Sequence, residues 1–192
     1  MQEFHNSTDI TKKNAFTQIQ FIDWQTQARA YKKYPNFFRR FSLDDYPQLN
    51  FIKNFGKSTF TKKYGKDEVN LRSNPSAGGL YPCEIYIQIR GVKSFLNGIY
   101  HYEPLENNLC LIHELTNDGV EYYLNIEQHE FIILVSNVYF RTTWKYEKRA
   151  IRYLLLDSGH QLASIYSALL LKEFEFNFSF QIKSLNELFS FD

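Results

Sequence analysis

The chain has 192 residues, of which 44% are hydrophobic and 22% charged, and its 22 basic and 21 acidic side chains leave a net charge of +1. This size fits one globular domain with a buried core, and the charge balance excludes the strongly basic field typical of nucleic-acid-binding proteins. No apolar run approaches the roughly 20 residues that cross a bilayer, and residues 1–16 lack the apolar segment of a secretory signal. Cys83 and Cys110 match no metal-ligand spacing, so we expect no metal site and a reducing, cytoplasmic compartment.

The first part of the chain is predicted to be an arm. Residues 1–35 are polar with scattered aromatic side chains, which is typical of an arm or of short helices. We therefore assign residues 1–40 to an N-terminal arm and residues 41–192 to the folded domain. Early in that domain, a short helix is predicted over about 47–55, closed by Gly56.

The middle of the chain is predicted to form mainly β-strands. The polar segment 57–70 is predicted to be a loop. Isoleucines at every second position over 84–90 have the two-residue period of a strand. A hairpin follows, with strands over 98–102 and 109–113. The continuous apolar run within 130–140 predicts a strand covered on both faces.

The last third is dominated by a long helix over 149–174, because apolar side chains recur there at helical spacing. Gly159 lies in its middle, where glycine costs about 1 kcal/mol relative to alanine, so we expect another backbone, a helix or a ligand to approach closely. Residues 175–182 alternate like a strand, and 184–189 fit one or two helical turns. The order of elements predicts an α+β domain, with a mixed or mostly antiparallel central sheet flanked by helices and a long central helix.

Two glycines, Gly78 and Gly79, stand side by side in the stretch RSNPSAGGLYPCEIY, residues 72–86. With Pro75 fixing one dihedral angle upstream, their bare backbone could hydrogen-bond the edge of a planar heterocycle and lie flat on it. The alternative is a tight turn into the next strand that needs glycine for backbone reasons alone. The local sequence by itself favours this alternative.

Basic side chains gather between the end of the predicted strand and the first turns of the long helix. Because a helix N-terminus already favours anions, cations there are unfavourable unless a negative group lies nearby. That group is either the phosphate of a ligand or the carboxylates of Glu147 and Asp157 in the same segment. The basic residues are Arg141, Lys145, Lys148, Arg149 and Arg152.

Several common chemistries find little support. Asp157 and His160 lie three residues apart on one helix face, a spacing more often found for a buried hydrogen bond than for a catalytic dyad. No serine or cysteine in a nucleophile elbow accompanies them, which argues against a hydrolase. The chain has no G-x-G-x-x-G or P-loop pattern, which argues against a Rossmann site or a nucleoside triphosphatase. Cys83 is interpreted as a small buried apolar residue rather than a reactive thiol.

Three segments, in this order along the chain, resemble the SagB-type branch of the nitroreductase-like flavoproteins. They are LRSNPSAGGLYPCEIYI, GIYHYEPLENNLCLI and YFRTTWKYEKRAIRYLLLDSGHQLAS. The resemblance implies a nitroreductase-like fold with a noncovalent FMN at the interface of a homodimer, and a long buried helix at the dimer contact. It therefore implies an FMN-dependent oxidoreductase.

The resemblance also implies roles for individual residues. Lys145 and Tyr146 correspond to the Lys-Tyr pair implicated in proton removal during azoline oxidation, and Lys145 would act as a general base if burial or neighbouring arginines lowered its pKa. A cation beside a flavin would stabilise the reduced anion, and further cations would neutralise its phosphate. The residues expected to contact or support FMN are Arg72, Pro75, Ser76, Ala77, Gly78, Gly79, Arg141, Arg149, Arg152, Asp157, Gly159 and His160.

The sequence departs from the family pattern in three places. The N-terminal Arg-x-Ser phosphate clamp has only Arg39–Arg40 or Lys62–Lys63 as substitutes, and Glu147 stands where a glycine usually follows the Lys-Tyr pair. The chain also stops before the last strand expected. Two functions therefore stay open: an oxidoreductase acting on an azoline-containing peptide, a nitro compound or a quinone, or a noncatalytic scaffold that binds a partner without FMN.

Overall fold

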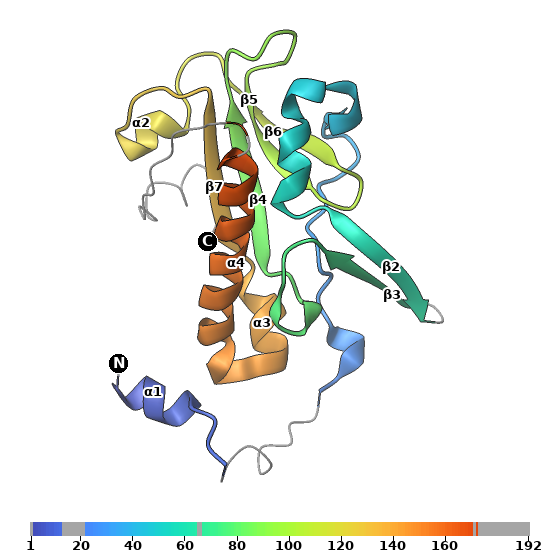
Figure 1. Ribbon diagram of the computed structural model, residues 1–192, viewed down its shortest axis with the longest axis vertical. Helices are drawn as coiled ribbons and strands as arrows, with labels where there is room; N and C mark the ends of the chain where they lie inside the picture. Colours follow the sequence, from blue (N-terminus) through green and yellow to red (C-terminus); the bar gives the residue numbers. More distant parts are fainter. Residues whose placement is uncertain (1, 13–21, 65–66, 171, 173–192) are drawn as a thin grey trace.

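The computed structural model of the chain describes residues 2–12, 22–64, 67–170 and 172 (Figure 1). Its strands are β1 (Arg40–Ser42), β2 (Ser58–Tyr64), β3 (Asp67–Arg72), β4 (Cys83–Ile89), β5 (Gly98–Glu103), β6 (Asn108–Glu114) and β7 (Phe131–Asn137). Its α-helices are α1 (Gln2–Thr8), α2 (Val120–Leu124), α3 (Tyr139–Tyr146) and α4 (Ala150–Leu170). Short 3₁₀ helices lie at Trp24–Thr26, Leu43–Asp45, Pro47–Phe55, Ala77–Gly79 and Glu147–Arg149.

Five strands form one sheet in the order β1-β6-β5-β4-β7, and every described pairing in it is antiparallel. The predicted hairpin is confirmed as β5 and β6, and the alternating isoleucines are confirmed as β4. Ile85, Ile87 and Ile89 belong to a large core that also contains side chains of α4 and of the 47–55 helix. A smaller apolar cluster joins Ile99 and Ile132 of the sheet to α2. This is the predicted α+β architecture, with α4 lying along one face of the sheet (Figure 1).

The strand predicted over 130–140 is shorter than expected, since β7 ends at Asn137 and α3 begins at Tyr139. Its apolar run is covered on both faces, as predicted. Ile133 and Val135 pack against the large core, whereas Ile132 belongs to the smaller cluster beside α2. The apolar run could not show where the strand stops, because Tyr139 and Phe140 are apolar too and lie exposed on α3.

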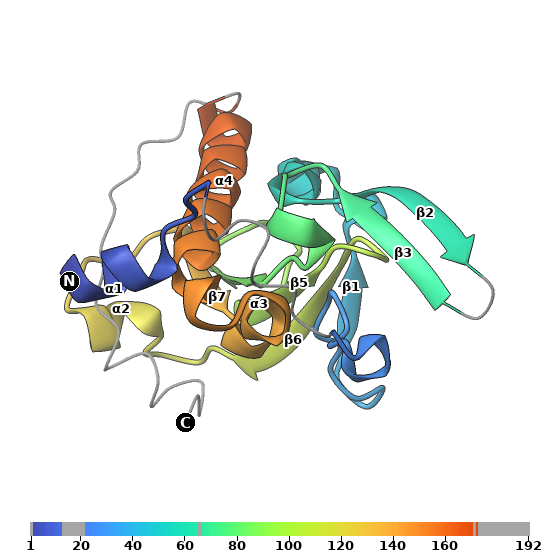
Figure 2. The ribbon, with the colours of Figure 1, turned by 90° about the horizontal axis from the view of Figure 1, so that it is seen from below.

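The predicted helix over 47–55 is confirmed in position and is a 3₁₀ helix that ends at Gly56. The prediction of a loop over 57–70 is wrong, because β2 and β3 form an antiparallel ribbon in this segment. Figures 1 and 2 show the ribbon standing away from the central sheet. A ribbon with little core to cover needs no apolar face, which explains its polar composition. The two strands pair along their length, from Ser58 with Arg72 to Tyr64 with Asp67.

The long helix is confirmed as α4, which spans Ala150–Leu170. It does not continue back into the basic segment, because Glu147 adopts a left-handed backbone with φ of 43° and separates α3 from α4. The basic residues therefore lie on three consecutive elements: α3, the 3₁₀ helix Glu147–Arg149 and the start of α4. The strand predicted over 175–182 and the helical turns over 184–189 lie outside the described residues.

Candidate active site

Asp157 of α4 ties the glycine turn to the long helix. Its carboxylate accepts a hydrogen bond of 2.7 Å from Ser76 Oγ and one of 3.0 Å from the amide of Ala77. Ser76 Oγ in turn accepts one of 2.9 Å from the amide of Tyr81, where the chain leads into β4. Asp157 is 3% exposed, so these bonds are shielded from water and fix the start of the turn against α4.

The turn itself brings bare backbone against the end of α3. Gly78 and Gly79 both have φ of 66°, a left-handed conformation that favours glycine. A Cβ atom on Gly78 would lie 2.8 Å from Tyr146 Oη and 2.9 Å from Lys145 Nζ, whereas one on Gly79 would meet nothing within 4 Å. The turn needs glycine at both positions for its backbone, and Gly78 also lets the ends of Lys145 and Tyr146 come close; contact with a planar heterocycle stays a prediction.

The Lys-Tyr pair forms the other half of the site. Lys145 is half-buried, and its Nζ lies 5.6 Å from the ring centroid of Tyr146. In the part of the chain that the structure describes, no ion pair or hydrogen bond of Lys145 Nζ is found. The Tyr146 ring packs 4.0 Å from that of Tyr153, and burial, with the nearby Tyr153 and Asp157, raises the pKa of the Tyr146 phenol. Tyr146 therefore holds its proton at neutral pH.

A separate, deeply buried charge cluster lies around Glu84 of β4. Arg141 pairs with its Oε1 at 2.6 Å and also donates to the carbonyl of Tyr81 at 2.8 Å, while His101 Nε2 contacts Oε2 at 2.8 Å. Burial alone would raise the pKa of Glu84, but His101, Arg141 and Arg72 together lower it to about 2. Arg141, expected as a cofactor ligand, is thus occupied by a buried carboxylate.

Arg72 lies next to this cluster and keeps one unused donor. Its guanidinium sits between the rings of Tyr31 and Tyr81 and donates through Nη2 to the carbonyl of Ala30. Its Nε is buried without a hydrogen-bond partner among the described residues. An unpaired buried donor is costly, so Arg72 Nε is a candidate contact for a ligand.

The remaining predicted residues do not converge on the turn. Arg152 donates to Thr8 Oγ1 at 2.8 Å and to the backbone of His5, so it anchors α1, and Arg149 donates to the hydroxyl of Tyr153 at 3.3 Å. Exposed positions are taken by Pro75, Gly159 and His160. A Cβ on Gly159 would meet nothing within 4 Å, so the close approach predicted there does not come from the described part of the chain.

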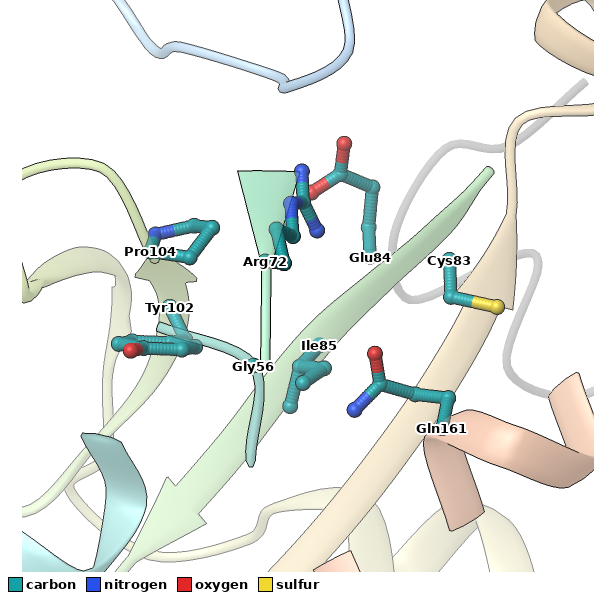
Figure 3. A pocket seen from close by; sticks show the side chains of 8 residues that line it. All are labelled: Gly56, Arg72, Cys83, Glu84, Ile85, Tyr102, Pro104 and Gln161. Atoms are coloured by element: carbon teal, nitrogen blue, oxygen red, sulfur yellow. The ribbon is translucent and has the colours of Figure 1, made fainter. Parts of the chain in front are cut away.

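Figure 3 shows a narrow crevice beside Arg72, where the Arg72 and Glu84 side chains extend toward the same end. The crevice is too narrow to admit a water molecule. A second pocket, of about 470 Å³, lies between the N-terminal arm and the β5–β6 turn. The crevice is lined by Gly56, Arg72, Cys83, Glu84, Ile85, Tyr102, Pro104 and Gln161.

Comparison with known proteins gives two informative likenesses, although no family model matches the chain. Over 106 residues the chain is 31% identical to "Putative nitroreductase MJ1384" of Methanocaldococcus jannaschii, which covers 52% of this chain and 53% of that protein. Its structure matches the crystal structure of a "putative nitroreductase" from Anabaena variabilis with a TM-score of 0.85 and 26% identity, covering all of this chain and 43% of that one. The fold is nitroreductase-like.

The chain therefore spans only about half the length of these nitroreductase-like relatives. A third likeness, to the E. coli microcin synthetase McbBCD complex with truncated pro-MccB17 bound, has 16% identity and a TM-score of 0.44. That score is too low to assign a branch within the nitroreductase-like proteins.

The donors at this candidate site could hydrogen-bond a flat ring with an electron-rich edge. They are the Nε of Arg72, which has no hydrogen-bond partner among the described residues, and the half-buried ammonium of Lys145, with open space beside Gly79. A ring reaching Arg72 Nε requires the narrow crevice to widen. Among the described residues, no group of three or more His, Cys, Asp or Glu side chains could hold a metal. None of the described helices is both long and apolar enough to span a membrane.

Sequence reasoning missed the part that the N-terminal arm plays here. Trp144 Nε1 donates to Thr26 Oγ1 at 2.9 Å, and the rings of Trp24 and Trp144 lie 5.5 Å apart. These contacts join positions more than a hundred residues apart in the sequence. No local pattern signals such a contact.

Proposed function

We propose that the chain is an FMN-dependent oxidoreductase. The observation that carries the proposal is the meeting of Gly78 with Lys145 and Tyr146, held in place by the bonds from Asp157 to Ser76 and Ala77. A bound flavin would supply reversible two-electron transfer, which no amino-acid side chain provides at such a site. The nitroreductase-like fold and the names of its relatives support this reading.

The residues proposed to hold the flavin are Arg72, Gly78, Gly79 and Lys145. Arg72 would donate its unused Nε–H to a ring acceptor, and the ammonium of Lys145 would stabilise negative charge on a reduced ring. Gly79 has open space around it and lets a flat group approach the backbone, whereas Gly78 already lies against the ends of the Lys145 and Tyr146 side chains. Tyr146, which keeps its proton at neutral pH, would donate a hydrogen bond or a proton to a reacting atom.

The finer assignment to the SagB-type branch is also a proposal, supported by the three segments that resemble it. An azoline-containing peptide, a nitro compound and a quinone are the substrate classes that fit this assignment. Cys83 and Cys110 are both free and buried, which supports the cytoplasmic location we propose.

A direct experiment is the absorbance spectrum of the purified protein before and after added FMN and gel filtration. The proposal expects flavin bands that stay with the protein and bleach on chemical reduction. NAD(P)H-driven reduction of nitroaromatics and quinones then separates these substrate classes from azoline peptides. A folded protein that stays colourless after incubation with FMN would exclude a flavoenzyme.

The second candidate function is a noncatalytic scaffold. Two observations favour it: Arg141 is held in a buried ion pair, and the crevice beside Arg72 admits no water molecule. On this reading the nitroreductase-like fold binds a partner and the Lys-Tyr pair is a surface feature. The same experiment decides, because the scaffold predicts a folded protein that takes up no FMN.

We also propose that the flavin site lies at the interface of a homodimer formed through α4. Large apolar side chains on this helix are exposed in the single chain, with Leu155 71% and Leu156 59% exposed. Gly159 on the same helix is open and would let another backbone approach. Exposed apolar surface of this kind on one helix is typical of an interface.

A further inference from the structure

The N-terminal arm is fixed to the candidate active site by hydrogen bonds along its length. The carbonyl of Ala30 accepts from Arg72, the amide of Lys32 donates to Glu84 Oε1 at 2.9 Å, and Thr26 Oγ1 accepts from Trp144 at 2.9 Å. At the start of the turn over Trp24–Thr26, Asp23 accepts from the amide of Gln25 at 3.0 Å. The position of Trp24 is therefore set by the hydrogen bonds of its neighbours.

The indole of Trp24 is not used as core. It is 62% exposed and meets the half-buried Trp144 edge-on, with ring centroids 5.5 Å apart and planes at 71°. Large aromatic rings held in place yet open to water offer stacking surface at little entropic cost. We call Trp24 and Trp144 the aromatic wall.

The aromatic wall stands beside the unpaired cation of the site. Lys145 Nζ lies 5.8 Å from the ring centroid of Trp24, and it would lie 2.9 Å from a Cβ on Gly78. No acidic side chain pairs with it in the described ranges. An aromatic surface next to a free ammonium suits a planar ring that carries an anionic oxygen.

We propose that the N-terminal arm completes the active site and that Trp24 is a substrate-contact residue. Trp24 stacks on the substrate, which is a planar aromatic compound bearing an anionic oxygen, and Lys145 holds that oxygen. This inference rests on the proposed function, since it names the substrate side of the same site. It favours a planar aromatic oxidant, a quinone or nitroaromatic that also carries a carboxylate or phenolate, over an azoline peptide.

The chain offers a direct probe, because its two tryptophans are the two residues of the aromatic wall. We expect 2-naphthoate to quench tryptophan fluorescence saturably, and cyclohexanecarboxylate, which has the charge without the aromatic ring, to bind at least fivefold more weakly. Trp24→Leu should weaken 2-naphthoate binding, measured by calorimetry, by about five- to tenfold, the range for losing one aromatic contact. Trp24→Phe should retain most of the affinity.

The matched control is Tyr122→Leu, which removes another aromatic ring that is 70% exposed but lies on α2 and touches Tyr123. It should leave 2-naphthoate binding unchanged. Equal binding by wild type and Trp24→Leu, both folded by circular dichroism, overturns the proposal. Equal affinity for the two carboxylates overturns it as well.

The titration is repeated with FMN at saturation. Unchanged 2-naphthoate binding supports a substrate contact beside the flavin, whereas competition by FMN means that the two ligands occupy the same place and overturns the assignment to substrate. If the protein binds no FMN but still binds 2-naphthoate through Trp24, the proposed flavoenzyme fails while the aromatic ligand site stands. The two proposals can therefore fail separately.

Discussion

Arg141 and Lys145 lie one helical turn apart on α3, yet they do different work. Arg141 is 4% exposed and pairs with the buried Glu84, whereas Lys145 is half-buried and has no charged partner in the described structure. The first cation completes the fold and the second is free for chemistry. Pooling both into one basic cluster, as the sequence suggested, hides this division. Substitutions at these residues and at their neighbours, together with a change of pH, test this division.

The largest expected effect is the loss of the buried pair. Arg141→Met strands the carboxylate of Glu84 without its closest cation, and breaking a buried pair from one side typically costs about 3–5 kcal/mol of unfolding free energy. Urea denaturation measures this loss of unfolding free energy. The matched control, Lys145→Met, removes a cation from the same helix and should change stability by about 0.5 kcal/mol or less. Equal losses from the two substitutions would contradict the division.

Acid should weaken the same cluster. The pKa of Glu84 is lowered from 4.5 to about 2 in the folded protein, so its stabilising contribution is present above pH 4.5 and is lost as the pH falls toward 2. The shift corresponds to about 3 kcal/mol. Urea denaturation at several pH values across this window should show the loss in wild type and a flatter profile in Glu84→Gln. Parallel profiles for the two proteins would rule out Glu84 as the cause.

Substitutions at the end of α3 should lower activity strongly while leaving the stability of the protein almost unchanged. Lys145→Met and Tyr146→Phe should each lower kcat about 100-fold, because a positioned acid–base group contributes roughly 10²–10⁴-fold. Their urea midpoints should stay close to that of wild type. Steady-state kinetics with a quinone acceptor provides the readout. Full activity in Lys145→Met would remove this residue from the mechanism.

Substituting the two glycines of the turn should have smaller effects, and the two substitutions should differ only in FMN binding. Alanine at either position must adopt a left-handed backbone, which costs about 1–2 kcal/mol. Only Gly78→Ala also pushes against Lys145 Nζ and Tyr146 Oη, since Gly79 has open space around it. We expect similar losses of stability from both, but weaker FMN binding from Gly78→Ala alone. Equal FMN affinities for the two variants would show that the close approach at Gly78 is irrelevant to the site.

The smallest effect on stability is expected at the exposed face of α4. Leu155→Glu should change the unfolding free energy of the single chain by about 0.5 kcal/mol or less, because Leu155 is 71% exposed. If α4 forms the homodimer, light scattering should show that this variant is a monomer while wild type is a dimer. A variant with the same mass as wild type would place the interface elsewhere.

Much of the fold could be predicted from the sequence, because its signals are local. The isoleucine alternation located β4, and the helical spacing of apolar residues located α4. The different roles of Arg141 and Lys145 could not be predicted from the sequence. They depend on Glu84, which comes close to Arg141 only through the tertiary fold. The contact of Trp24 with Trp144 is equally non-local. The β2–β3 ribbon was missed because its polar composition resembles that of a loop.

The central claim is that the glycine turn and the end of α3 together form a flavin site. The most direct test is the dissociation constant of FMN for the purified protein, measured by quenching of flavin fluorescence. Saturable binding of one FMN per chain, weakened in Lys145→Met and preserved in the stable control Tyr122→Leu, is the predicted result. A folded protein that binds no FMN, or binds it equally well without Lys145, would contradict the claim.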